Sequence, residues 1–236
     1  MIEAINRYLK RTGFEAFQPK AVLFDMDGVL INSMPNHAIA WSRAMASFGI
    51  HMTEADAYAT EGARGIDTIR QMVKVQQGKD ISLEESQAMY DEKARQFGLL
   101  PTAKIMEGAL ELHEKIHRAG LKIAIVTGSG QRPLIQRLVH DFPRVKEEMI
   151  VTAYDVKRGK PHPDPYLMGM EKCGTKPWET IVVENAPLGV QAGHDAQAFT
   201  IAINTGILPD EILWNAGADI VLSGMPELYV RWEEIK

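Results

Sequence analysis

Cysteine and long apolar runs are scarce in this chain of 236 residues. Cys173 is the only cysteine, so no intrachain disulfide can form and nothing argues for an oxidising compartment. Without a neighbouring His or Cys motif, Cys173 is predicted to be a buried core residue. Apolar runs such as 21–24 and 123–126 are far too short to span a bilayer. Residues 1–17 are amphipathic and interrupted by charge, unlike a signal peptide, so we expect a cytoplasmic protein.

An excess of basic charge is also missing. The chain has 26 basic and 31 acidic side chains, a formal net charge of -5 at pH 7. This balance gives no electrostatic reason to expect a nucleic acid or an anionic membrane as partner. It does not exclude a small anionic substrate, because a metal ion and a few cations can outweigh the bulk charge locally. The length favours one domain with an insert, and the sequence leaves the oligomeric state open.

Short, mostly apolar segments alternate with helical patterns along much of the chain. Because these segments are apolar on both faces, they are typical of parallel strands covered by helices on both sides. The alternation predicts an α/β fold, a doubly wound, Rossmann-like parallel sheet with right-handed crossovers. The predicted strands span 21–25, 122–127, 149–151, 180–184, 200–203 and 219–222. The predicted helices between and after them span 107–119, 130–140, 165–173, 187–196 and 226–235.

A long helical stretch interrupts this alternation after the first strand. Helical patterns alone occur near 36–48, 53–60, 66–77 and 82–97. Ser82 and Glu85 form a capping box that begins the last of these helices. Hinges are predicted at Asn32–Pro35 and Gly98–Pro101, where the insert leaves and rejoins the sheet.

The resulting domain organisation is a core interrupted by a lid. The sequence predicts an all-helical cap domain over 33–98, inserted into a catalytic core domain formed by 1–32 and 99–236. Residues 1–19 are predicted to form an extra N-terminal helix, whose role the sequence does not indicate.

The strongest chemical signal is Phe24-Asp25-Met26-Asp27-Gly28, where an apolar strand ends in two carboxylates two positions apart. Ligands of open α/β sheets bind at the carboxyl ends of strands, so both acids are expected in the site. Two acids this close repel each other unless a cation or a proton intervenes. Magnesium binds carboxylates together with phosphate oxygens, so Mg2+ is the expected cofactor. One acid then serves as metal ligand and nucleophile and the other as proton carrier; a solvated turn is the alternative.

Two further segments offer groups that bind phosphate. Thr127, Gly128 and Ser129 follow an apolar strand and precede a helix, where a hydroxyl and free N–H groups can hold a phosphate. A loop of small residues is the alternative there. Lys160 stands in the proline-rich segment Gly159–Pro165, and a fixed ammonium group there would orient a nucleophile and offset phosphate charge. A solvated lysine is the alternative.

Glu184 and Asn185 end the strand 180–184, and Pro187 begins the helix after it. Both side chains offer oxygen atoms to a metal, although either one is also typical of a capped strand–helix turn. The four segments occur in order along one alternating sheet. Their conjunction is therefore much more specific than any single segment.

Together these segments resemble the haloacid dehalogenase superfamily of phosphotransferases, in the branch with a helical cap after the first strand. The resemblance covers nearly the whole chain from Ala21. It implies that Asp25 is the nucleophile, and that Asp27 is the general acid/base whose main-chain carbonyl also ligates magnesium. It likewise implies a phosphate-binding hydroxyl at Thr127, a charge-balancing Lys160, and a metal-holding pair at Glu184 and Asn185. Members usually have Asp where Asn185 stands, and Asn brings a carbonyl oxygen but no charge.

The predicted cap contributes three candidates. The segment Asn36–Trp41 resembles the corresponding part of β-phosphoglucomutases, which makes His37 a candidate for substrate binding; a satisfied helix residue is the alternative. Glu61 lies between cap helices, where related enzymes place a specificity loop and sugar-phosphate mutases commonly have Lys. We hypothesise that Glu61 completes the magnesium shell and selects a compact substrate; a solvated loop acid is the alternative. Arg64 is a lesser candidate for steering the anion.

The sequence thus predicts a magnesium-dependent phosphohydrolase that acts on a small phosphorylated molecule, with inorganic pyrophosphate favoured by resemblance to pyrophosphatase-type members. A β-phosphoglucomutase-type sugar-phosphate mutase is the first alternative, because it also begins with a phosphoaspartate. A non-catalytic scaffold is disfavoured by the presence of Asp25, Asp27 and Lys160. Release of phosphate by water, as opposed to isomerisation without net release, separates the first two alternatives.

Overall fold

The computed structural model describes residues 1–129 and 132–235. Its described residues contain one sheet of six parallel strands in the order β3-β2-β1-β4-β5-β6. This confirms the predicted doubly wound α/β fold, and all six strands lie within one residue of the predicted bounds. The strands are β1 (Ala21–Phe24), β2 (Lys122–Val126), β3 (Ile150–Val151), β4 (Thr180–Glu184), β5 (Phe199–Ile203) and β6 (Ile220–Leu222).

Strand β1 lies in the middle of the sheet and sets the register of its two neighbours. Phe24 of β1 pairs with Ile125 of β2 on one side and with Val183 of β4 on the other. Since all three strands run in the same direction, the residues that follow them emerge at the same edge of the sheet. The three chemical segments after β1, β2 and β4 therefore meet there.

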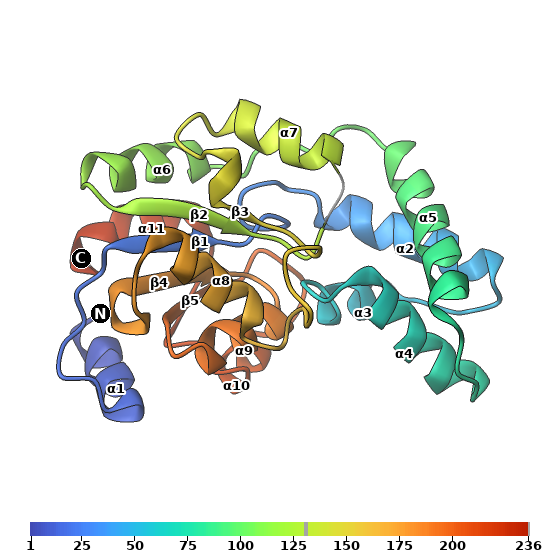
Figure 1. Cartoon of the computed structure of the whole chain (residues 1–236), viewed down its shortest axis with the longest axis horizontal. Helices are drawn as coiled ribbons and strands as arrows, with labels where there is room; N and C mark the ends of the chain where they lie inside the picture. The colour runs from blue at the N-terminus through green and yellow to red at the C-terminus, as the bar shows by residue number, and fades with distance from the viewer. Residues whose placement is uncertain (130–131, 236) are drawn as a thin grey trace.

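Alternate residues of β1 face two separate apolar cores, each covered by helices (Figure 1). Val22 and Phe24 pack with one layer, formed by α1 (Ile2–Thr12), α6 (Ala109–Arg118), α7 (Arg132–Asp141) and α11 (Met225–Arg231). Ala21 and Leu23 face the other layer, α8 (Asp164–Cys173) and α9 (Pro187–Asp195). Cys173 is buried in this second core, as predicted. No helix within the described residues is long and apolar enough to cross a membrane.

The helical insert projects from the carboxyl edge of the sheet and has a hydrophobic core of its own (Figure 1). Trp41, Met45, Ile69 and Met89 are among the residues that pack together in it. The predicted capping box is present, because Ser82 Oγ accepts from the Glu85 N–H at 3.1 Å. The insert consists of α2 (Met34–Ser47), α3 (Glu54–Ala59), α4 (Gly65–Gln77) and α5 (Leu83–Gly98).

Three helix predictions differ from the structure. The N-terminal helix was expected over 1–19 but ends at Thr12, because Gly13 adopts a left-handed conformation with φ 75° and its N–H caps Leu9 O. Helix α10 (Asp210–Asn215) was not predicted; it has only six residues and no long apolar period. The predicted start of the helix 130–140 lies outside the described residues, and the described part runs over Arg132–Asp141.

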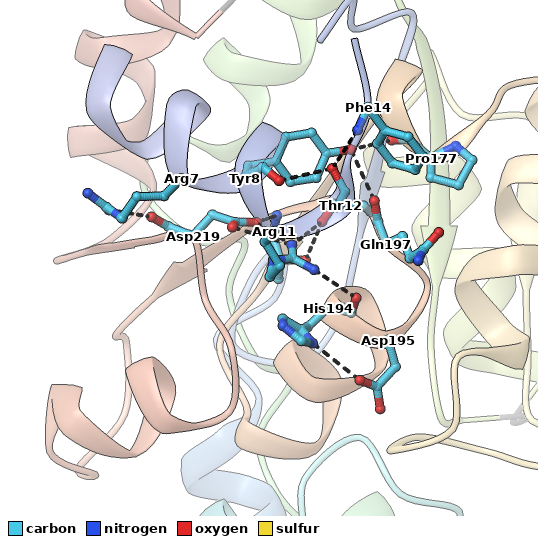
Figure 2. A network of polar contacts seen from close by, with 12 residues as sticks. Arg7, Tyr8, Arg11, Thr12, Phe14, Pro177, His194, Asp195, Gln197 and Asp219 are labelled. Carbon is cyan, nitrogen blue, oxygen red and sulfur yellow. Dashed lines mark hydrogen bonds and ion pairs between the residues drawn. The ribbon is translucent and has the colours of Figure 1, made fainter. Parts of the chain in front are cut away.

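Figure 2 shows how α1 is attached to the core. The buried Tyr8 donates its hydroxyl to Gln197 O at 3.0 Å and to Pro177 O at 3.3 Å. Arg11 Nη2 lies 3.2 Å from Asp219 Oδ2, and the same carboxylate oxygen accepts the Thr200 N–H at 2.9 Å. Asp219 is only 7% exposed, so its charge depends on these two donors. Helix α1 therefore closes the core beside β5 and β6.

This attachment yields a stability prediction. Arg11→Ala removes the cationic partner of a buried carboxylate and should lower the free energy of unfolding by about 1–3 kcal/mol, the range for an unsatisfied buried group. Urea denaturation followed by circular dichroism measures the change. Arg118→Ala is the matched control, because Arg118 makes only an exposed pair with Glu114 and its loss should stay within about 0.5 kcal/mol. Equal losses in both variants would contradict the proposed attachment.

Candidate active site

Lys160 lies at the centre of a buried polar cluster at the carboxyl edge of the sheet. Its Nζ donates to Asp25 Oδ1 and to Glu184 Oε1, each at 2.6 Å, and to Val126 O at 3.0 Å. Burial alone would lower the pKa of Lys160, but Asp25 and Glu184 raise it, so the ammonium group stays charged. The structure thus places this lysine between the ends of β1, β2 and β4 and away from solvent.

Asp25 has one oxygen in this cluster and one without a partner. Its Oδ2 is buried and forms no hydrogen bond with the protein. Burial raises the pKa of Asp25 well above its ordinary value; Lys160 opposes this shift and Glu184 adds to it. A second cation beside Oδ2 would restore the charged form, which is the form that attacks phosphorus.

Glu184 is held by four donors. Its Oε1 accepts from Lys160 and from the Tyr166 hydroxyl at 2.6 Å, and its Oε2 accepts the Asn185 and Ala186 N–H groups at 3.0 and 3.3 Å. The carboxylate also lies against α9, where a Cβ on Gly189 would stand 1.8 Å from Oε1. With four hydrogen bonds Glu184 supplies charge and orientation, and direct ligation of a metal would require it to release one of them.

Unlike Glu184, Asn185 has a side-chain oxygen that makes no hydrogen bond with the protein. Its Oδ1 is buried without a hydrogen-bond partner, as is Asp25 Oδ2. Two orphaned oxygens at adjacent strand ends suit a hard cation such as Mg2+, so the residues present fit the expected metal. Gly28 makes room for this arrangement: it has φ +81°, and a Cβ there would lie 2.1 Å from Asn185 Nδ2. Among the described residues no cluster of three His, Cys, Asp or Glu side chains forms a metal site.

Asp27 is oriented from the helical insert. Its Oδ1 accepts from the Ser33 hydroxyl and lies 3.1 Å from His37 Nε2. Burial alone would raise the pKa of Asp27, but His37 and Ser33 lower it on balance. His37 of α2 is therefore a direct partner of the predicted acid/base, and its ring stacks on Phe97 with centroids 4.4 Å apart.

Lys93 is a member of the site that the sequence did not point to. It lies on α5, is 3% exposed, and its Nζ is 2.7 Å from His37 Nδ1. The ammonium group also lies 5.0 Å from the Trp41 ring centroid and 5.3 Å from that of Phe97. Burial lowers the pKa of Lys93 to about 8, against the opposing effects of Glu61 and Asp27. The sequence signal that could have indicated this lysine is the presence of aromatic residues one helical turn before and after it.

Glu61 faces the same space from the segment between α3 and α4. The residue is half-buried, yet burial raises the pKa of its carboxyl, with His37 acting in the opposite direction. The following Gly62 packs directly on the core, because a Cβ on Gly128 would lie 2.7 Å from Gly62 O. The partly open pocket that Asp27, His37, Glu61, Lys93 and Ser129 help to line has a volume of about 30 Å3. Such a space holds about two water molecules.

The remaining predicted residues divide between the site and its rim. Thr127 is buried, and its Oγ1 accepts the Ser129 N–H at 3.0 Å beside the Asp25 strand. Arg64 is engaged elsewhere: its Nη1 donates to Lys157 O at 2.9 Å and its Nε to Asp67 at 2.7 Å. Arg64 thus fastens the insert to a core loop, and its charge is already paired.

Comparisons with known proteins agree with this geometry. A family model described as haloacid dehalogenase-like hydrolase matches residues 22–203. Hexitol phosphatase A of Escherichia coli (strain K12) is 35% identical over 212 residues, which cover 89% of this chain and 94% of that protein. Validoxylamine A 7'-phosphate phosphatase of Streptomyces hygroscopicus subsp. limoneus is 29% identical over 219 residues, 92% of this chain and 98% of that one.

A solved structure extends the likeness to three dimensions. It is a Bacteroides vulgatus protein described as a candidate beta-phosphoglucomutase, 48% identical, with a TM-score of 0.95. The match covers 99% of this chain and 95% of that one. The resemblance found from the sequence motifs is therefore confirmed at the level of the family and the fold.

The contact between Gly189 and Glu184 gives a prediction for the metal site. In Gly189→Ala the new methyl group displaces the Glu184 carboxylate and, through it, Lys160 and Asp25. Mg2+ affinity, measured by isothermal titration calorimetry, should fall about tenfold or more, the usual scale for disturbing groups that orient metal ligands. Gly98→Ala is the control, because a Cβ there meets nothing within 4 Å. Unchanged affinity in Gly189→Ala would show that Glu184 does not support the metal site.

Proposed function

Because the chain belongs to the haloacid dehalogenase-like hydrolase family and is a phosphatase of that type, we propose that it hydrolyses small phosphate compounds through a phosphoaspartate at Asp25, with Mg2+ as cofactor. The preferred substrate in this proposal is inorganic pyrophosphate. The observation that carries the mechanism is the carboxylate of Asp25, held through one oxygen by Lys160 and buried without a partner at the other. A cytoplasmic setting is part of the same proposal.

The proposed reaction has two displacements at phosphorus. The Asp25 carboxylate attacks phosphorus in line, the bond from phosphorus to the leaving oxygen breaks, and Asp27 gives its proton to that oxygen. Water then attacks the phosphorus of the phosphoaspartate and gives a proton to Asp27, while the bond from phosphorus to the Asp25 oxygen breaks. Inorganic phosphate leaves and both acids are restored. When bound, Mg2+ would be held by Asp25, Asn185 and the main-chain oxygen of Asp27, and would supply charge stabilisation to the transferring phosphoryl group.

Other groups hold charge and position during both steps. Lys160 offsets charge on the Asp25 side, and the Thr127 hydroxyl with the N–H group of Gly128 is suited to the phosphoryl oxygens. His37 and Ser33 orient the Asp27 carboxylate that moves the proton. Lys93, hydrogen-bonded to His37, brings positive charge to the side from which the leaving group departs.

The substrate proposal rests on Glu61 and on the small, polar space beside it. A carboxylate in this position repels a second phosphate unless a metal ion lies between them. Asn185 brings no charge to the metal, so Glu61 is proposed to supply the missing one as a further ligand when substrate and Mg2+ are bound. The space beside Glu61 is small and lined by charged groups, which favours a compact substrate such as pyrophosphate over a sugar phosphate.

Hydrolysis of a sugar or polyol phosphate is the second candidate. It is favoured by the named relatives, since hexitol phosphatase A is 35% identical over most of both chains. A sugar-phosphate mutase is the third, favoured by the name of the structural neighbour at 48% identity. All three candidate substrates exceed the space between the insert and the core, so each would need the insert to open. With a sugar phosphate, Lys93 would be the cation that faces it.

The phosphoaspartate proposal is tested by trapping the intermediate. Wild-type protein and variants are mixed with Mg2+ and acetyl phosphate, which has a good leaving group, and quenched in acid for mass spectrometry. Asp27→Asn should accumulate a phosphorylated peptide containing Asp25, because its second step lacks a base and slows about a hundredfold or more. Asp25→Asn should show none and should lose turnover, because an amide is a poor nucleophile. A phosphorylated Asp25→Asn protein would contradict the proposal.

The substrate proposal is tested at Glu61. In Glu61→Ala, kcat/KM for pyrophosphate should fall about tenfold or more relative to kcat/KM for hexitol and hexose phosphates, the scale of losing one metal-side ligand. Glu54→Ala is the control, because Glu54 is exposed on α3 of the same insert. A ratio that does not change in Glu61→Ala would remove Glu61 as the selector. Isomerisation of a hexose phosphate without phosphate release would instead establish the mutase.

A further inference from the structure

Tyr166 is a buried phenol in direct contact with the charged cluster. It lies on α8 with no exposed surface, and its hydroxyl donates to Glu184 Oε1 at 2.6 Å. Its ring lies under the ammonium group of Lys160, with Nζ 5.0 Å from the ring centroid. Burial and the neighbouring Glu184 and Asp25 raise the pKa of this phenol well above its ordinary value, so it stays protonated and can only be the donor.

The bond to Glu184 matters because Lys160 is shared between two acids. Its Nζ lies at 2.6 Å from both Asp25 Oδ1 and Glu184 Oε1. Glu184 Oε1 in turn accepts from both Lys160 and Tyr166. If the hydroxyl were absent, Lys160 would be the only donor to that oxygen and would be drawn toward Glu184. The hold of Lys160 on Asp25 would weaken by the same movement.

We propose that Tyr166 is a positioning residue for the nucleophile, acting through Glu184 and Lys160. Its hydroxyl satisfies Glu184 so that Lys160 remains on Asp25 Oδ1, and this contact leaves Asp25 Oδ2, like the orphaned Asn185 Oδ1, available to the expected metal. The same bond keeps Glu184 from rotating toward the metal. The inference rests on the proposed role of Asp25 as nucleophile and metal ligand.

The chain offers a matched control in Tyr8. Tyr8 is also fully buried, and its hydroxyl also donates to protein oxygens, Gln197 O and Pro177 O. Those acceptors are main-chain carbonyls that precede β4 and β5, at the edge of the sheet opposite the site, and Figure 2 shows them beside α1. Tyr8→Phe and Tyr166→Phe therefore make the same chemical change at the same burial. Only Tyr166→Phe alters the charged cluster.

The test measures metal binding and turnover separately. Mn2+ binding is followed by the electron paramagnetic resonance signal of the free ion, and kcat and KM are measured with p-nitrophenyl phosphate and Mg2+. Tyr166→Phe should weaken Mn2+ binding about tenfold and lower kcat about tenfold to a hundredfold, with KM nearly unchanged, the scale found for groups behind metal ligands. Tyr8→Phe should change neither quantity. Neither probe is pyrophosphate, so failure of the proposed substrate appears separately, as absent pyrophosphate hydrolysis by the wild type.

A double-mutant cycle shows whether the effect passes through Glu184. In a Glu184→Ala background the oxygen shared by the hydroxyl and Lys160 is absent, so adding Tyr166→Phe should change Mn2+ binding less than about twofold. Equal effects of Tyr166→Phe in both backgrounds would overturn the proposal, as would equal effects of Tyr8→Phe and Tyr166→Phe. Failure of Tyr166→Phe to fold, while Tyr8→Phe folds, would make the hydroxyl structural and would also overturn it.

Discussion

The ammonium group of Lys160 is the interaction on which the site depends. It places one positive charge between the carboxylates of Asp25 and Glu184, which come from neighbouring strands and would otherwise repel each other in a buried setting. Removing one partner of a buried ion pair is strongly destabilising, so the cluster holds together only as a unit. The parallel order of β2, β1 and β4 makes the unit possible, because it brings the three strand ends to one edge. The chemistry is thus a consequence of the sheet topology.

Much of the fold and of the candidate site could be predicted from the sequence, for a physical reason. Strands of a covered parallel sheet are apolar on both faces, so polar residues directly after them mark the edge where ligands bind. Asp25, Thr127 and Glu184 were found in this way, and the structure brings them together with Lys160. The predicted bounds of the cap, 33 and 98, agree with the helices α2 to α5 but stay a prediction as domain boundaries.

What the sequence did not indicate depends on contacts between distant elements. Lys93 stands in a helix rich in charged residues and reads as part of a solvated face; only the packing of α5 against α2 buries it beside His37. From the sequence, Tyr166 is expected to be an ordinary core residue, because a helical pattern does not indicate that its hydroxyl donates to Glu184. The early end of α1 depends on a single left-handed glycine, Gly13. Each of these features can be recognised only when the three-dimensional structure shows which residues it contacts.

Two parts of the chain contribute residues to the site. The segments after the strands carry the proposed nucleophile, the oxygens proposed to hold the metal and Lys160, whereas the insert contributes His37, Glu61 and Lys93. The two parts meet where Gly62 lies against Gly128, where Arg64 donates to Lys157 O and where His37 contacts Asp27. Because Glu61 and Lys93 lie on the insert, substitutions there can change the charge and size of the space above the strand ends while the residues after the strands stay the same. Relatives named for different phosphorylated compounds are what such a division would produce.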